Sequence, residues 1–474
     1  MSNKIFRVKP INQLLQDGEG GKSLNKVLGS FELTMLGVGA IIGTGIFVLT
    51  GVAAANYSGP ALILSFIISG LACAFAGLCY AEFAAMVPVA GSAYTYGYAA
   101  LGEIWAWIIG WDLILEYAVA IAAVAIGWSG YIVNLLSSIG INLPKQLINA
   151  PGVNGGVINL PAILIIAVIT GLLIIGVKES TTVNNIMVGI KLIVVLLFII
   201  LGVTHIKPAN WTPFMPYGWK GVFQGASIIF FAYIGFDAVS TAAEEVKNPQ
   251  KDLPRGIILS LIICTILYIV VSAILTGMVP YIQFKETSAP VAFALQQIGI
   301  NWGSALVSVG AVCGITSVLL VMMFGQTRVF FAMSRDGLLP KVFGEVHSKF
   351  RTPVKSTVLV GIVTALMAGF TPIGIVAELT NIGTLAAFMI VSAAVIVLRK
   401  KRPDLKRSFK CPMVPAVPIM AILFCGYLIY SLPRITQYRF IAWLAIGLVV
   451  YFIYGIKHST IEKYENAVEN EEVS

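Results

Sequence analysis

Long apolar stretches follow one another along almost the whole chain, and each is long enough to cross a lipid bilayer as a helix. A membrane-spanning helix needs about 20 predominantly apolar residues. Strands of a transmembrane barrel would instead alternate apolar and polar positions over about ten residues, and these stretches do not alternate. We therefore predict an all-α membrane protein with twelve transmembrane helices. The twelve stretches are Phe31–Ala55, Pro60–Val87, Gly102–Asn134, Asn159–Val177, Val183–Thr204, Val222–Thr241, Gly256–Val279, Ser304–Met333, Val354–Phe370, Ile373–Leu398, Val414–Leu432 and Phe440–Ile456.

Little of the chain lies outside this predicted transmembrane domain, residues 31–458. The segments on either side of it, 1–30 and 459–474, are short polar tails, and no apolar run that resembles a cleavable signal peptide precedes Phe31. No loop or tail has the length of a second hydrophilic domain. We therefore expect no soluble catalytic head.

The composition excludes a soluble enzyme. Apolar residues make up 58% of the 474 residues and charged residues 11%, whereas a soluble domain carries about 45–50% apolar and about 25% charged residues. An aqueous fold of this size has no interior large enough to hide that excess. The residues therefore point to the bilayer as the solvent of most of the chain.

The net charge of +9 follows from topology. Of the 31 Lys and Arg residues, 24 fall on the side of the predicted helices that holds both termini, and six fall on the other side. Lys and Arg accumulate in cytoplasmic loops, so we predict a plasma-membrane protein with both termini in the cytoplasm. The same asymmetry explains the positive charge without a nucleic-acid partner.

Two of the predicted spans carry signs of a broken helix near mid-membrane. Four glycines lie within nine residues of the first span, Gly37 to Gly45, and the sixth span contains the turn-prone segment 230–237. Unpaired backbone in a membrane survives only where it lines a cavity or is buried by protein. Its amides attract a carboxylate, and its carbonyls attract an ammonium group. Gly39 and Gly43 also form a G-x-x-x-G pair, for which close helix packing is the alternative interpretation.

Because the two breaks are five spans apart, the two helices cross the membrane in opposite directions. That is the arrangement of an inverted repeat with a substrate site at the midplane. The sequence therefore predicts a transporter that meets both charged ends of an amino acid with backbone groups.

One lysine lies deep inside a predicted span. Lys191 is about 13 Å into the span that begins at Val183, at 1.5 Å per residue. A central lysine is costly in a membrane, so it should face the bundle interior with a partner or a task. We predict a proton carrier. The alternative is a static ion pair with Glu116, which is central in the third span and shares a helix face with Asp112.

Metal and nucleophile chemistry has no support in the sequence. The six cysteines form no C-x-x-C pair, and the three histidines lie at span ends or in loops. Intramembrane hydrolysis needs a nucleophile with a base, or a metal set, at depth. We therefore expect no enzyme, no metal and no cofactor other than the proton as coupling ion.

Several motifs together resemble the amino acid–polyamine–organocation superfamily, and within it the bacterial permeases close to the cationic amino acid transporters. The resemblance covers nearly the whole chain in the expected order. The motifs lie at 39–47 (GAIIGTGIF), 88–94 (PVAGSAY), 236–249 (FDAVSTAAEEVKNP), 253–257 (LPRGI) and 333–340 (MSRDGLLP).

That resemblance implies two inverted five-helix repeats, about 31–205 and about 220–400, with two peripheral helices at 414–456. It implies that Lys191 takes the place that a sodium ion holds in related carriers. It also implies backbone contacts to the substrate from both broken helices. The carboxylate would bind at Ile42, Gly43, Thr44 and Gly45, and the α-amino group at Phe231, Ala232 and Ile234.

The preferred substrate depends on the far end of the pocket. Glu116 is the one central acceptor for a cationic side chain. Met322 would shorten the pocket if it faces the cavity; alternatively, Met322 only fills the core. We expect a proton symporter for small neutral L-amino acids such as alanine, with cationic amino acids as weaker substrates. The alternatives are a uniporter or exchanger for arginine and lysine, and an amino-acid sensor on the same fold. The apolar outer faces would accept membrane lipids, a sterol or a single-span accessory peptide equally, so the sequence selects none of these.

Overall fold

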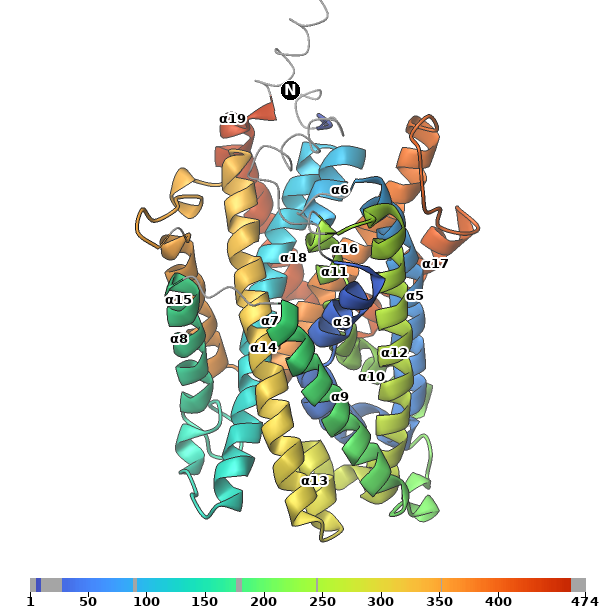
Figure 1. The fold of residues 1–474 in the computed structure, drawn as a ribbon, viewed down its shortest axis with the longest axis vertical. Helices are drawn as coiled ribbons and strands as arrows, with labels where there is room; N and C mark the ends of the chain where they lie inside the picture. Colours follow the sequence, from blue (N-terminus) through green and yellow to red (C-terminus); the bar gives the residue numbers. More distant parts are fainter. Residues whose placement is uncertain are drawn as a thin grey trace, which may run out of the picture.

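The computed structural model describes residues 6–9, 28–87, 92–175, 181–243, 246–350 and 352–461. Within them the regular structure is helical, and the only β-type pairs are two isolated bridges, Leu28 with Val246 and Ile148 with Asn159. Figure 1 shows long helices standing side by side in one bundle. The all-α prediction is confirmed. Residues 88–91 of one predicted motif, Glu244 and Glu245 of another, and most of both tails lie outside the described residues.

Seven helices in the described part of the chain are long and apolar enough to cross a membrane: Gly45–Met86, Glu103–Ser138, Asn185–Val203, Pro249–Met278, Asn301–Arg335, Ile373–Lys401 and Arg434–His458. Four shorter apolar helices accompany them: Ser30–Ile41, Leu160–Ile175, Val354–Phe370 and Ala416–Ser431. Every one of the twelve apolar stretches contains helical residues. A helix closes its backbone hydrogen bonds within itself, which is what a bilayer demands of a crossing segment.

The helix boundaries follow local signals. Proline opens α12 and α13, where its missing amide costs no hydrogen bond. The α-helices are α3 (Ser30–Ile41), α4 (Thr50–Ala53), α5 (Leu62–Met86), α6 (Ser92–Ala100), α7 (Glu103–Ser138), α8 (Leu160–Ile175), α9 (Thr181–Val203), α10 (Gly218–Ile229), α11 (Ala238–Thr241), α12 (Pro249–Met278), α13 (Pro290–Gln297), α14 (Asn301–Arg335), α15 (Val354–Phe370), α16 (Ile373–Lys401), α17 (Ala416–Ser431), α18 (Arg434–Val450) and α19 (Ile456–His458).

The centre of the bundle is built from the broken first helix and the long helices around it. The helix α7 packs against α14 and α16, while α12 packs against both α3 and α5. The helices α8 and α15 pack against each other and lie at the left of Figure 1, with α17 at the right. Large apolar side chains such as Leu164, Leu366 and Leu423 are exposed on these outer helices. Such a surface suits contact with lipid tails, whereas water would disfavour it.

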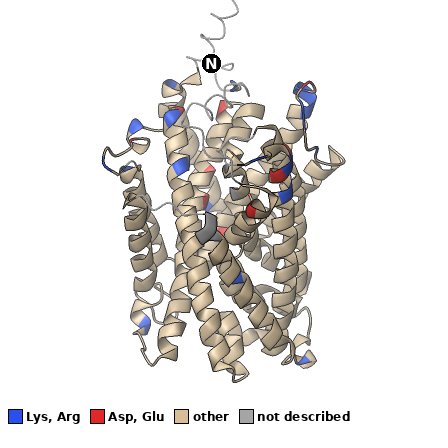
Figure 2. Ribbon diagram, in the orientation of Figure 1, with Lys and Arg blue, Asp and Glu red and all other residues tan. Residues whose placement is uncertain are grey.

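Charged residues gather at the end of the bundle marked N, as the blue and red parts of the ribbon in Figure 2 show. Some are buried there: Lys9 Nζ lies 3.3 Å from Asp336 Oδ1, and the Tyr94 hydroxyl donates to Asp336 Oδ2 over 2.7 Å. The Thr460 amide donates to the Asp336 carbonyl. Residues near both chain ends therefore meet at the same end of α14.

Candidate functional site

The first helix is interrupted where its glycines cluster. The helix α3 ends at Ile41, Ile42 is extended with φ −76° and ψ 101°, and a π-helical turn, Gly45–Leu49, follows. The first amides of a helix have no partner within that helix. The first amides of the turn that follows the break therefore have no partner within that turn, and they belong to the residues of the predicted carboxylate site.

The second interruption follows α10. A 3-10 turn, Phe230–Tyr233, is followed by Ile234 in an extended conformation with φ −62° and ψ 133°. Gly235 then has a φ of +118°, a conformation that glycine adopts without strain. The short helix α11 begins three residues later. Of the residues predicted to offer carbonyl groups, Phe231 and Ala232 lie in this turn, and Ile234 directly follows it.

The two breaks touch each other. A Cβ atom added to Gly45 would lie 2.5 Å from Ala232 Cβ, and it would also overlap Ala232 Cα. A Cβ added to Gly235 would lie 2.9 Å from the carbonyl carbon and oxygen of Ala40. Carbon atoms in contact normally lie about 3.5–4.0 Å apart. Glycine is therefore required on both sides of the contact, and the structure brings the two predicted half-sites together.

Tyr268 of α12 joins the two breaks, and the sequence did not single it out. Its hydroxyl donates to the Ile41 carbonyl over 2.9 Å and to the Ala232 carbonyl over 2.7 Å, and its side chain is fully buried. A hydroxyl has one hydrogen, so the two carbonyls share a single donor. Tyr268 is therefore a positioning residue that sets the register of one broken helix against the other.

Lys191 is fully buried, and its Nζ atom donates to the Gly39 carbonyl over 2.6 Å. Its aliphatic stem passes over Gly314 of α14, where an added Cβ would lie 2.7 Å from Lys191 Cγ. An ammonium group thus meets a backbone carbonyl three residues before the first break. This contact ties α9 to the half of the first helix that precedes the break.

Thr44 lies at the break with an unused hydrogen-bonding group. It is 1% exposed, and its Oγ1 has no hydrogen-bond partner among the described residues. Its side chain packs against Gly127 of α7. A buried polar atom without a partner carries a free-energy cost. A bound carboxylate would supply the missing acceptor. On the other side of the turn, the Tyr131 hydroxyl donates to the Phe47 carbonyl over 2.6 Å.

Two acidic residues of α7, Asp112 and Glu116, face α16. Asp112 is 1% exposed and Glu116 is 4% exposed. A Cβ added to Gly383 of α16 would lie 2.7 Å from Asp112 Oδ1 and 3.6 Å from Glu116 Cβ. Neither carboxylate oxygen of Asp112 has a hydrogen-bond partner among the described residues. The predicted shared face is confirmed, and glycine makes room for it on the facing helix.

Met322 lies on the side of α14 that contacts the first break. Val318 is one helical turn earlier, and a Cβ added to Gly43 would lie 3.2 Å from Val318 Cγ2. Residues four apart share a helix face, so Met322 lies on the same face as this contact. Its exposure of 8% contrasts with that of the fully buried Met323.

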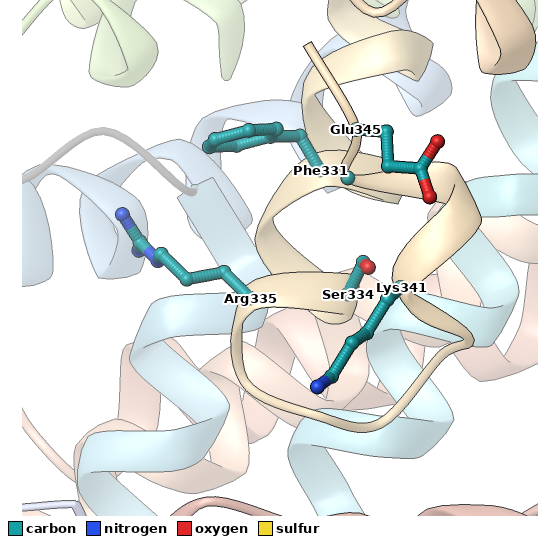
Figure 3. A pocket seen from close by; sticks show the side chains of 6 residues that line it. Phe331, Ser334, Arg335, Lys341 and Glu345 are labelled. Atoms are coloured by element: carbon teal, nitrogen blue, oxygen red, sulfur yellow. The ribbon is translucent and has the colours of Figure 1, made fainter.

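A pocket elsewhere in the molecule has a different character. It lies at the end of α14 that carries the charged residues, and its lining includes Phe331, Ser334, Arg335, Lys341 and Glu345. Figure 3 shows Arg335 and Lys341 pointing in different directions, with Glu345 on the far side. These side chains do not converge on a common point. The described residues also contain no group of three or more His, Cys, Asp or Glu residues arranged to hold a metal ion.

Comparisons with known proteins agree with this geometry. The model of the amino acid permease family matches residues 28–454. The chain is similar to the branched-chain amino acid permease BcaP of Bacillus subtilis, with 56% identity over 98% of this chain and 100% of the relative. It is also similar to the methylthioribose transporter of the same organism, with 53% identity over 97% and 100%. It is 38% identical to the vacuolar cationic amino acid transporter 4 of Arabidopsis thaliana, over 85% and 68% of the two chains. The chain therefore belongs to the amino acid permease family, and it is a transporter, not an enzyme.

Proposed function

We propose that this permease imports L-amino acids by proton-coupled symport through alternating access. The observation that carries the proposal is the contact between the two helix breaks, which Tyr268 bridges and to which Lys191 is tied through Gly39. The start of one helical turn and the carbonyls of another therefore meet at one place among buried residues. That combination matches the two charged ends of an amino acid and needs no charged side chain to bind them.

The proposed membrane layout has twelve crossings. The first repeat, about 31–205, and the second, about 220–400, are related by inversion, and the helices at 414–456 lie at the periphery. The protein lies in the plasma membrane, and both termini lie in the cytoplasm. The accumulation of charged residues at the end that holds the N-terminus supports this orientation.

The substrate carboxylate is proposed to bind at Ile42, Gly43, Thr44 and Gly45. The unpartnered Thr44 hydroxyl supports this assignment. The ammonium group is proposed to bind the carbonyls of the sixth-helix turn, among them Ala232. The substrate ammonium group would share the Ala232 carbonyl with the Tyr268 hydroxyl. Substrate binding would thus change the hydrogen bond that joins the two broken helices.

Lys191 is proposed to couple transport to the proton. Its ammonium donates to the Gly39 carbonyl, and a neutral amine has a weaker claim on that acceptor. Loss of the proton would therefore loosen α9 from the half-helix that precedes the break. Alternating access needs such a change to depend on which side of the membrane supplies the proton. No sodium ion is part of the proposal.

Small neutral side chains fit the proposed pocket best. Met322 and Val318 present apolar surface beside the first break, which favours alanine and the aliphatic amino acids. The relative at 56% identity is named a branched-chain amino acid permease, which agrees with such a pocket. The carboxylate of Glu116 favours cationic amino acids as a second class of substrate. The plant relative is named a cationic amino acid transporter.

Uptake into proteoliposomes tests the proposal. Radiolabelled alanine is supplied with an inward proton gradient and without sodium, and each of the twenty amino acids and methylthioribose is added as a competitor. We expect accumulation above equilibrium that a protonophore abolishes. Binding without accumulation would instead indicate an amino-acid sensor. Uptake that only equilibrates, or that needs internal substrate, would indicate a uniporter or an exchanger. Strong competition by methylthioribose alone would refute an amino acid as the substrate.

A further inference from the structure

The end of α16 and the loop that joins it to α17, together called the α16–α17 loop, carry the densest group of cations in the chain. The basic segment of this loop, residues 399–410, contains seven Lys and Arg residues and one acidic residue, Asp404. The accumulation of cytoplasmic cations explains why such a segment is basic. It does not explain how the individual charges are arranged.

The three arginines of the segment each pair with an acidic residue of this protein. Arg399 makes a two-pronged contact with Glu82 of α5, at 3.0 Å and 2.6 Å, and Arg407 lies 3.3 Å from the same carboxylate. Arg402 pairs with Asp404 at 2.8 Å, and this pairing lowers the pKa of the Asp404 carboxyl. The arginines therefore neutralise the acids that the loop meets.

Hydrogen bonds to side chains and backbone hold the loop in a defined shape. The Cys411 amide donates to Glu82 over 2.7 Å, and the Ser408 hydroxyl donates to Gln250 over 2.8 Å. A guanidinium nitrogen of Arg407 also donates to the Arg402 carbonyl over 2.9 Å. The segment is thus folded onto α5 and α12, and it presents its remaining side chains from fixed positions.

The four lysines of the segment, by contrast, point outward. All are exposed, and none has an ion pair or side-chain hydrogen bond within the part of the chain that the structure describes. They are Lys400, Lys401, Lys406 and Lys410. Four positive charges therefore remain available to a partner outside the protein.

An exposed apolar residue follows these lysines in the chain. Met413 is 75% exposed, and its φ of +45° is a conformation that L side chains rarely adopt. The following helix α17 continues the apolar surface with the exposed side chains of Ile419 and Leu423. Figure 2 shows blue residues at the upper right, where this loop leaves the bundle. Lysines next to bilayer-facing apolar residues lie at headgroup depth.

We propose that the α16–α17 loop is a binding site for anionic phospholipid headgroups. Lys400, Lys401, Lys406 and Lys410 contact the phosphates, and Met413 inserts among the acyl chains. Juxtamembrane clusters of four to eight basic residues attract anionic lipid, with about a fivefold gain in affinity per residue near the surface. Because Glu82 of α5 binds Arg399 of α16 and Arg407 of the loop, a bound lipid would also stabilise the contact of α5 with α16.

Native mass spectrometry of the full chain in detergent tests the site. Dioleoyl-phosphatidylglycerol and dioleoyl-phosphatidylcholine are titrated separately, and bound lipids are counted. We expect wild-type protein to prefer phosphatidylglycerol. Removal of all four lysines should weaken phosphatidylglycerol binding by about tenfold or more and leave phosphatidylcholine binding unchanged. The variant is K400Q/K401Q/K406Q/K410Q.

The matched control removes the same charge from exposed lysines elsewhere at the same end of the bundle. It is K251Q/K341Q/K349Q/K457Q, and we expect less than a twofold effect. If both variants lose phosphatidylglycerol binding equally, or neither does, the lysines of the loop attract lipid no more than other lysines do. Either result would overturn the proposal. If the fourfold variant fails to fold, K400Q/K401Q and K406Q/K410Q serve separately, each with a several-fold loss expected.

A soluble headgroup analogue shows whether the site binds a lipid or a free phosphate compound. Glycerol 1-phosphate should bind far more weakly than the diacyl lipid, and Met413→Ser should weaken lipid binding without changing the binding of glycerol 1-phosphate. Equal affinity for the soluble compound and the lipid would make this a site for soluble anions and refute the lipid assignment.

Discussion

The contact between Gly45 and Ala232 predicts that Gly45→Ala is among the most damaging small substitutions in the chain. The added Cβ would lie 2.5 Å from Ala232 Cβ and would also overlap Ala232 Cα. Backbone atoms cannot rotate away as a flexible side chain can. Because contacting carbons need about 3.5 Å, the two broken helices would have to separate by about 1 Å.

The expected cost follows from that displacement. Overpacking of a closely packed interior costs about 1–3 kcal/mol, which corresponds to about a 5- to 150-fold change in an equilibrium constant. The half-sites for carboxylate and ammonium would move apart by the same 1 Å. We therefore expect G45A to lower both the thermal stability of the protein and its apparent affinity for alanine, the latter by about 5- to 150-fold.

Gly189→Ala is the matched control. Gly189 lies in α9, and a Cβ added there meets nothing within 4 Å. In a helix interior, alanine is favoured over glycine by about 1 kcal/mol, so G189A should leave stability and affinity unchanged or slightly improved. The assay is thermal unfolding in detergent, with and without alanine, for both variants. A wild-type melting temperature and a wild-type alanine-induced shift for G45A would refute the proposed contact between the breaks.

Three further substitutions test the surroundings of the site. Lys191→Ala should abolish accumulation driven by an inward proton gradient while the protein still folds; undiminished accumulation would end the proton-carrier role, and the exposed Lys285→Ala serves as the control. Tyr268→Phe removes the hydroxyl shared by two buried carbonyls, which should lower the free energy of unfolding by about 1–3 kcal/mol; a chemical denaturation curve that matches wild type would disprove the bridge. Met322→Ser should shift the competition profile of alanine uptake toward arginine and lysine, and an unchanged profile would mean that Met322 is core filler.

The sequence located the two helix breaks because their signal is local. Glycine weakens a helix wherever it lies, so the cluster from Gly37 to Gly45 is visible without any knowledge of its neighbours. The burial of Lys191 was predictable for a similar reason, since its depth in an apolar span leaves few alternatives to an interior position. The family was equally accessible, because the motifs that carry the resemblance are contiguous in the chain.

Tyr268 shows where sequence reasoning stopped. It is one of 17 tyrosines, and a tyrosine in an apolar span has no depth or charge signal of its own. Its importance lies in the position of one oxygen atom between the carbonyls of Ile41 and Ala232. The arginine contacts of Glu82 were hidden in the same way, because a charge count does not show which cations are already paired.

The amino-acid sequence by itself determined that this chain forms apolar helices, that one end of the bundle is basic, and that the first and sixth predicted spans break. Each of these follows from free energies that individual residues contribute to any structure: burial of apolar surface, the cost of a charge in a bilayer, and the weak helix propensity of glycine. Only the tertiary structure decided that Gly45 meets Ala232, that Lys191 meets the Gly39 carbonyl, and that Tyr268 holds both breaks. Those contacts join residues far apart in the chain, and their energies depend on atomic separations that exist only after the helices have packed.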